Sequence, residues 1–165
     1  MKRFFLITLM VFLPMISHGA GYVIADYASG GEIDAQSIGL EMGAIFLSPY
    51  HPNGGAFSLG LGISIADTDE NPPSFSNHQG KINDGNEQEV YASFGAEIVP
   101  AFFGVAGVGY ATQDVVKFDT SQERSSETDN NISWMLCMRY VLEGLNMGLG
   151  YHSRRGVMAS LGVAF

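Results

Sequence analysis

The chain has one cysteine, few basic residues and, beyond its first twenty residues, no long hydrophobic run. A lone Cys137 forms no internal disulfide, and it rules out a cysteine-based metal cluster. There are 8 Lys and Arg against 17 Asp and Glu. Because phosphate contacts need cationic side chains, we expect no nucleic-acid partner. No later stretch has the ~18 apolar residues of a membrane-spanning helix, so none is expected in the mature chain.

Residues 1–20 have the pattern of a secretory signal peptide. Lys2 and Arg3 precede an almost unbroken apolar run from Phe4 to Ile16, and residues 17–20 supply small side chains for cleavage. The run is shorter than the ~20 residues that a transmembrane helix needs, so an uncleaved anchor is the less favoured alternative. We therefore expect a single mature domain at 21–165. Loss of Lys2 and Arg3 leaves 6 basic against 17 acidic side chains, a formal charge of −11.

Large apolar side chains alternate with very small ones along residues 56–65. Successive side chains of a β-strand point to opposite faces, so this strand has one large apolar face and one face of small residues. The same alternation recurs at residues 37–46, 90–98, 132–141, 145–152 and 157–165. In these six segments the second face carries mostly Gly, Ser and Ala. Its clear charges are Glu41, Glu97 and Arg139.

Two classes of fold satisfy this alternation. A soluble barrel or sandwich buries the apolar face and needs a polar face toward water, which these segments lack. A membrane barrel places the apolar face against lipid and the small residues in a narrow lumen. We therefore predict an all-β, closed antiparallel transmembrane β-barrel. A soluble β-sandwich or lipocalin-like barrel is the alternative.

Turn-forming residues divide the mature chain into eight predicted strands. An even count places both termini on the periplasmic side, with short inner turns and longer outer loops. The longest connections, 67–87 and 117–129, then fall on the outer side, as expected for such a barrel. The predicted strands are 21–28, 36–48, 55–66, 88–98, 102–116, 130–141, 145–152 and 156–165. Aromatic girdles at the membrane interfaces are predicted from Tyr22, Tyr27, Tyr91, Phe102, Tyr110, Trp134, Tyr140 and Tyr151.

The chain resembles the small OmpA/OmpX-type outer-membrane barrels. The likeness rests on the signal peptide, the strand pattern and the last strand, which ends in Phe165 after apolar residues at alternate positions. The resemblance implies a barrel of about eight strands in the outer membrane of a Gram-negative bacterium, in contact with membrane lipid and lipopolysaccharide. It also implies that Phe165 is the C-terminal assembly signal read by the barrel-assembly machinery. Barrels of this type serve unrelated functions, so the fold does not select one.

Glu41, Glu97 and Arg139 are predicted to form a polar cluster in the lumen. Glu97 and Arg139 lie near the periplasmic ends of strands that are second neighbours, so we expect them to pair. Pairing avoids the high cost of an isolated buried charge. The resemblance also implies a plug of interior salt bridges, whereas a polar path for small solutes is the alternative. Cys137 is expected inside the barrel as a small packing residue.

The tight outer turn at residues 152–155 raises the question of catalysis. Outer-membrane lipid A deacylases use a His-x-Ser pair, but here His152 and Ser153 are adjacent, so a strand would point them apart. We therefore predict no catalytic residue. Arg154 and Arg155 are expected on the surface, where they would contact lipopolysaccharide phosphates.

Two acidic stretches, 66–89 and 114–129, are expected to be solvated outer loops. Asp67-x-Asp69 offers hard oxygen ligands, but its surroundings do not have the spacing of a calcium-binding loop. We predict no metal or cofactor. The favoured interpretation is a non-enzymatic outer-membrane protein with a structural or surface-interaction role through these loops. A narrow channel for small solutes and a lipid-acting enzyme are the alternatives, and the sequence leaves the oligomeric state open.

Overall fold

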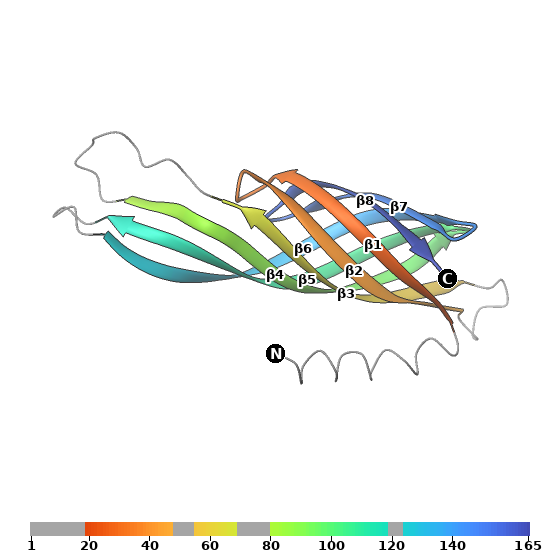
Figure 1. Cartoon of the computed structure of the whole chain (residues 1–165). Coiled ribbons are helices and arrows are strands. Elements are labelled where there is room, and N and C mark those ends of the chain that lie inside the picture. Colours follow the sequence, from red (N-terminus) through yellow and green to blue (C-terminus); the bar gives the residue numbers. More distant parts are fainter. Residues whose placement is uncertain (1–18, 48–54, 69–79, 119–123) are drawn as a thin grey trace.

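The computed structural model is a closed antiparallel barrel of eight strands (Figure 1), as the sequence predicts. It describes residues 19–47, 55–68, 80–118 and 124–165. Each strand pairs with the next one along the chain, and β1 pairs with β8 to close the sheet. No helix in these residues is long and apolar enough to cross a membrane. The strands are β1 (Gly19–Gly30), β2 (Ala35–Leu47), β3 (Ala56–Asp67), β4 (Gly80–Val99), β5 (Phe102–Phe118), β6 (Arg124–Leu142), β7 (Leu145–His152) and β8 (Gly156–Ala164).

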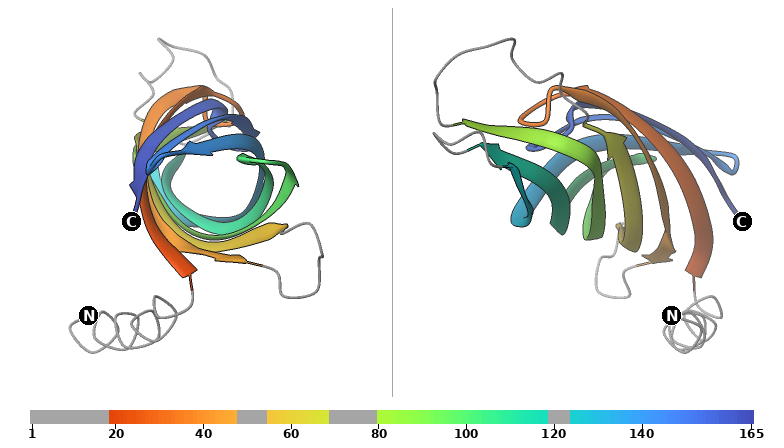
Figure 2. Two further views of the ribbon diagram at one scale, coloured as in Figure 1. Left: turned by 90° about the vertical axis from the view of Figure 1, so that its right-hand side faces the viewer. Right: turned by 60° about the vertical axis from the view of Figure 1, so that its left-hand side comes forward.

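Strands β4, β5 and β6 are longer than the others and extend past the barrel rim (Figure 2). Their pairing continues to Phe118, which meets Gly80 on one side and Arg124 on the other. We call residues 80–85, 114–118 and 124–131 the projecting sheet. Residues 80–87 and 124–129 of the predicted outer loops are strand, so the predicted boundaries were wrong there. A strand that lies outside lipid does not need an apolar face. The alternation of large apolar and small residues that marks the barrel strands is therefore absent here.

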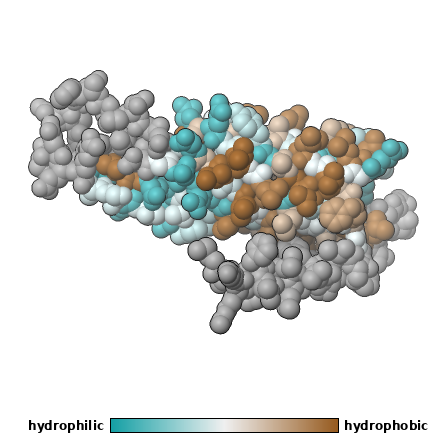
Figure 3. All heavy atoms as spheres, in the orientation of Figure 1, coloured by the Kyte–Doolittle hydropathy of each residue, from teal (hydrophilic) through white to brown (hydrophobic). Residues whose placement is uncertain are grey.

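The outer wall of the barrel carries a belt of exposed apolar side chains (Figure 3). On β5 the belt runs from Phe102 to Tyr110, close to the ~9–11 residues that a membrane strand needs. Aromatic contacts mark both ends, with Phe102 against Tyr140 and Trp134 against Tyr151. Residues on the outer face include Ile38, Leu61, Val108, Leu136, Leu149 and Leu161.

Two of the predicted girdle residues, Tyr22 and Tyr91, lie inside the barrel, at 1% and 5% exposure. Each occupies an inward position of its strand, and the glycine paired with it on the neighbouring strand leaves space for its ring. A Cβ at Gly62 would lie 2.2 Å from Cζ of Tyr91, and one at Gly43 would lie 2.6 Å from Cζ of Tyr22. Glycine-rich inner faces therefore make room for large polar side chains.

The side chains of β5 alternate between the lipid-facing wall and the lumen. Ala106, Val108 and Tyr110 face outward, whereas Gly107, Gly109 and Ala111 face the lumen. Cys137 is buried in the lumen, as predicted, and it packs in an apolar cluster. That cluster also contains Phe103, Val105, Met135 and Met158.

Candidate functional site: the lumen

The first polar cluster of the lumen is centred on Glu41 of β2. Its Oε1 accepts hydrogen bonds from Tyr22 Oη, Ser93 Oγ and Arg139 Nη1, each at 2.7 Å. Its Oε2 accepts a further bond from Arg139 Nη2 at 2.6 Å. This two-bond contact between guanidinium and carboxylate is the strong geometry of such pairs. The donors come from β1, β4 and β6, so the cluster spans the lumen.

Arg139 is held on two sides. The carboxylate of Glu41 takes both terminal nitrogens, and the guanidinium carbon lies 5.8 Å from the centre of the Tyr22 ring. A cation over an aromatic face is attracted to it, and more strongly when water is excluded. Both Glu41 and Arg139 are almost fully buried. The structure therefore brings together two of the three residues of the predicted cluster.

Glu97 does not belong to this cluster, and the predicted Glu97–Arg139 pair is wrong. The Glu97 carboxylate instead accepts hydrogen bonds from the backbone amides of Ala56 and Ala101, both at 2.9 Å. Phe103 of β5 lies between the two residues, because it pairs with Glu97 on one side and with Arg139 on the other. Glu97 thus ties the β4–β5 turn to the start of β3.

A second cluster, nearer the outer end, is centred on Glu89 of β4. Its Oε1 accepts hydrogen bonds from Ser133 Oγ and from His152 Nε2, the latter at 3.0 Å. Its Oε2 accepts one from Ser64 Oγ at 2.9 Å and lies 3.4 Å from Arg155 Nε. The Glu89 carboxylate on β4 therefore contacts side chains from β3, β6, β7 and the β7–β8 turn.

Arg155 links this second cluster to the β1 wall. Its Nη1 donates to Asp26 Oδ1 at 2.5 Å, and Tyr91 Oη donates to Asp26 Oδ2 at 3.1 Å. The guanidinium carbon also lies 5.7 Å from the centre of the Tyr91 ring. Arg155 is only 1% exposed, so the tight outer hairpin sends a charged side chain into the barrel.

Arg154 enters the lumen closer to the mouth. Its Nε donates to Glu87 Oε2 at 2.8 Å, and its Nη2 donates to the same oxygen and to Gln113 Oε1. Its Nη1 lies 3.1 Å from Glu32 Oε2, and Glu32 is 66% exposed. Arg154 therefore joins the buried carboxylate of Glu87 to the surface of the β1–β2 turn.

These positions correct two predictions from the sequence. Arg154 and Arg155 do not face outward toward lipopolysaccharide, and Glu87 and Glu89 are not in a solvated loop. All four are buried in the lumen, where the arginines neutralise carboxylates that would otherwise be costly to bury. The inward positions of β4 continue from Ser93 through Tyr91 and Glu89 to Glu87. This alternation in the sequence could have placed both glutamates inside the barrel.

His152 and Ser153 point in different directions, as predicted. His152 Nδ1 accepts hydrogen bonds from the amides of Arg154 and Arg155, both at 3.3 Å. The hydrogen of the ring is therefore on Nε2, where it is donated to Glu89. Ser153 Oγ instead accepts a hydrogen bond from the amide of Trp134 at 3.1 Å. This turn thus holds no pairing of a serine nucleophile with a histidine base.

The outer turns are joined to each other. The amide of Ile33 donates to the carbonyl of Arg154 at 3.0 Å, and that of Glu32 donates to the carbonyl of Ser153 at 3.3 Å. Together with the ion pair of Glu32 and Arg154, these bonds fasten the β1–β2 turn to the β7–β8 turn. These two turns, which are neighbours because β1 pairs with β8, are therefore held together at the rim of the barrel.

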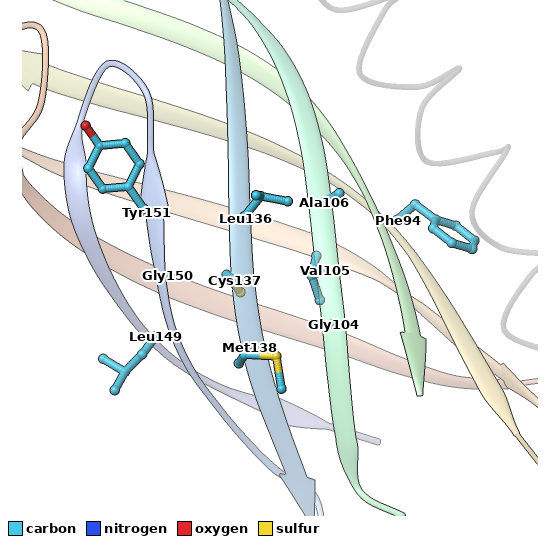
Figure 4. A pocket seen from close by; sticks show the side chains of 10 residues that line it. All are labelled: Phe94, Gly104, Val105, Ala106, Leu136, Cys137, Met138, Leu149, Gly150 and Tyr151. Carbon is cyan, nitrogen blue, oxygen red and sulfur yellow. The ribbon is translucent and has the colours of Figure 1, made fainter. Parts of the chain in front are cut away.

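Two hollows lie on the outer wall, and the second, between β2 and β5, has Ser64 and Glu89 of the second cluster among its lining residues. Figure 4 shows the first, whose small residues Gly104, Ala106 and Gly150 lie among larger apolar side chains of β4 to β7. In the parts of the chain that the structure describes, no group of three or more His, Cys, Asp or Glu side chains could hold a metal ion. Asp69, His51 and His78 lie outside those parts, as do residues 1–18 with most of the predicted signal peptide.

No protein-family model matches the chain, and no curated protein matches it either. Among solved structures it is similar to Neisserial surface protein A (NspA), with 12% identity and a TM-score of 0.47 over 89% of this chain and 97% of that one. It is also similar to Ail, the attachment invasion locus protein of Yersinia pestis, with 9% identity and a TM-score of 0.49 over 89% and 96%. Identities this low transfer neither a partner nor an activity.

Proposed function

We propose that this chain is an integral outer-membrane barrel with a closed lumen, and that its role is non-enzymatic: it presents the projecting sheet to protein partners. The observation that supports membrane insertion is the inverted distribution of polarity. Large apolar side chains cover the outside of the barrel, whereas arginines and carboxylates fill the inside. A water-soluble barrel has the opposite arrangement, because apolar burial stabilises its fold.

The contacts inside the lumen support a structural role for its polar residues better than conduction through a channel. Two clusters of ion pairs and hydrogen bonds cross it, one around Glu41 and one around Glu89. A guanidinium that binds a carboxylate with two bonds in a low-dielectric interior is costly to separate. The same network supports a non-enzymatic role, because Ser133 and His152 both donate to Glu89 and neither is free to activate the other.

Membrane insertion is tested by placing a charge on the belt. Leu61 lies at the middle of the β3 face and is exposed. We expect Leu61→Arg to lower the free energy of unfolding in lipid vesicles by about 2–4 kcal/mol, since a cation at mid-bilayer is poorly solvated. The measurement is urea unfolding followed by fluorescence of Trp134, the single tryptophan. Thr128→Arg in the projecting sheet is the matched control, and equal stability of the two variants would contradict insertion.

In the part of the chain that the structure describes, no strand pairs with β6 before Met135 on the side away from β5. Strand β7 pairs with β6 only from Met135 onward. The Trp134 amide then donates to Ser153 Oγ, and the Trp134 carbonyl accepts a hydrogen bond from the Ser153 amide. Along a strand, alternate residues turn their N–H and C=O groups to the same side. Ile132, Asn130, Thr128 and Ser126 therefore turn these groups away from β5, and their side chains are exposed. Such an edge can accept an extended segment of another protein as an additional strand.

The proposed edge interaction is tested with a labelled extended peptide of alternating Thr and Val residues. We expect the Thr128→Pro barrel to bind it at least tenfold more weakly, since proline removes an edge N–H group. Thr128→Ala keeps that group and should bind like the unaltered chain. The assay is fluorescence anisotropy with folded protein in micelles. Equal binding by both variants would exclude recognition through this edge.

The end of the chain supports the predicted assembly signal. The backbone of Phe165 exchanges two hydrogen bonds with Gly21, and its side chain is exposed on the outer wall. The ring is thus available at the seam between β1 and β8. Recognition of Phe165 by the barrel-assembly machinery stays a proposal.

A further inference from the structure

The second hollow of the outer wall lies where the apolar belt ends. Outward-facing residues of neighbouring strands meet in rows across the wall, and two of these rows line the hollow. The row nearer the periplasmic end is apolar and consists of Leu40, Ile63, Val90 and Tyr110. The row nearer the outer end consists of Ile38, Ile65, Gln88 and Thr112. The wall therefore changes from apolar to polar within the hollow, on its β4–β5 side.

The rows around the hollow locate the edge of the hydrocarbon layer. One row further out, Asp67 of β3 pairs with Asn86 of β4, so both strands are polar there. Tyr110 lies one row below the polar pair Gln88 and Thr112 and is 50% exposed, and tyrosine is enriched at membrane–water interfaces. The hollow thus reaches from the hydrocarbon layer to the outer interface.

The lining of the hollow is apolar with two neutral polar side chains at one end. Its volume is about 710 Å³, and Ile63 and Val90 are each 58% exposed, so the apolar row is open to a ligand. Among the described residues that line the hollow, only Glu89 carries a charge. Its carboxylate points into the lumen, where it accepts a hydrogen bond from Ser64 Oγ. A phosphate group would therefore find no cation in this hollow.

We propose that the hollow binds one hydrocarbon chain of an outer-leaflet lipid, and that Gln88 and Thr112 bind the amide linkage and hydroxyl group of that chain. The proposal rests on the membrane insertion proposed above. A lipid changes from hydrocarbon to polar linkage at the interface, and the lining of the hollow makes the same change over one row. The chain would lie on Ile63 and Val90.

The two polar side chains favour a β-hydroxyacyl chain in amide linkage over an ordinary ester-linked chain. The Gln88 amide can both donate and accept hydrogen bonds, and so can the Thr112 hydroxyl. An ester linkage offers acceptors only, whereas an amide-linked β-hydroxyacyl chain offers a carbonyl, an N–H group and a hydroxyl. Polar groups that leave water at the edge of the hydrocarbon layer need such partners. The amide-linked chain therefore uses both roles of each side chain.

The test is an NMR titration of the mature chain folded in detergent micelles. The probe is N-(β-hydroxymyristoyl)glucosamine, which is uncharged, and the comparison lipid is a phosphatidylcholine with myristoyl chains. We expect the probe to give saturable shifts of the backbone amides of Ile65, Val90 and Tyr110, which line the hollow. The phosphatidylcholine should bind there about tenfold more weakly, because its esters donate no hydrogen bond.

Two variants separate the polar contacts from the apolar ones. Gln88→Leu/Thr112→Val should weaken binding of the probe about tenfold, since two hydrogen-bonding groups are lost. Its matched control is Gln36→Leu/Thr128→Val, which makes the same changes at exposed positions outside the hollow.

Val90→Trp should also weaken binding of the probe about tenfold, because the larger side chain occupies the hollow and leaves both polar groups in place. Val108→Trp is its control, since Val108 is 59% exposed on the same wall and does not line the hollow. All four variants keep the lumen residues, so they should fold.

Unchanged affinity in both the polar variant and Val90→Trp would overturn the proposal, as would shifts spread evenly around the barrel. Equal binding of the phosphatidylcholine would overturn recognition of the amide linkage. These failures differ from a failure of membrane insertion, which would show as an undiminished stability of Leu61→Arg in vesicles. If Leu61→Arg is destabilised and the probe shows no preference for the hollow, the barrel inserts but holds no lipid at this place.

Discussion

Arg139→Leu should lower the free energy of unfolding by about 3–5 kcal/mol, because it leaves the buried carboxylate of Glu41 without a cation. Glu41 keeps its hydrogen bonds from Tyr22 and Ser93, but hydroxyl groups do not neutralise its charge. The measurement is reversible urea unfolding in detergent or vesicles, with the shift between unboiled and boiled protein on a gel as a second readout of folding.

A double-mutant cycle separates the ion pair from the loss of side-chain packing. In Glu41→Leu/Arg139→Leu both charges are absent, so the double variant should be more stable than Arg139→Leu alone. Glu97→Gln serves as the control, since Glu97 binds turn amides and lies outside the cluster. Additive losses in the double variant would show that Glu41 and Arg139 are not energetically coupled, contrary to the geometry.

The alternation of large and small residues was sufficient to predict the barrel, because a wall between lipid and a narrow lumen imposes a period of two on every strand. It predicted the outward face of β3 correctly. It failed for β6 above the barrel, where residues 125–128 are all exposed and polar residues such as Thr128 and Asn130 carry no signal of orientation.

The partners inside the lumen could not be read from the sequence. Alternation tells which residues point inward, but the register around the whole barrel decides which of them meet. Arg139 reaches Glu41, 98 positions away along the chain, while Phe103 separates it from Glu97. Arg154 and Arg155 were misplaced for a related reason. A tight turn suggests that its side chains lie on the surface. The inward carboxylates Glu87 and Glu89 need cations nearby, and this need would have indicated that the two arginines point inward.

The β7–β8 hairpin is the other place where a single substitution should have a large effect. Arg155→Met keeps the length of the side chain but removes the cation shared by Asp26 and Glu89. We expect a loss of about 3–5 kcal/mol, since both carboxylates are buried. Arg154→Met should cost less, on the order of 1–3 kcal/mol, because one of its partners, Glu32, lies in water.

The same substitution should loosen the barrel mouth. Arg155 anchors the turn whose carbonyl at residue 154 accepts the amide of Ile33. Its loss should release the β1–β2 turn, so hydrogen exchange at the Ile33 amide should accelerate in Arg155→Met, while an amide deep in the wall, such as that of Leu61, stays protected. If Arg154→Met and Arg155→Met were equally destabilising and left exchange at Ile33 unchanged, the hairpin would be held by its backbone alone. The two arginines would then neutralise carboxylates in the lumen without holding the β1–β2 and β7–β8 turns together.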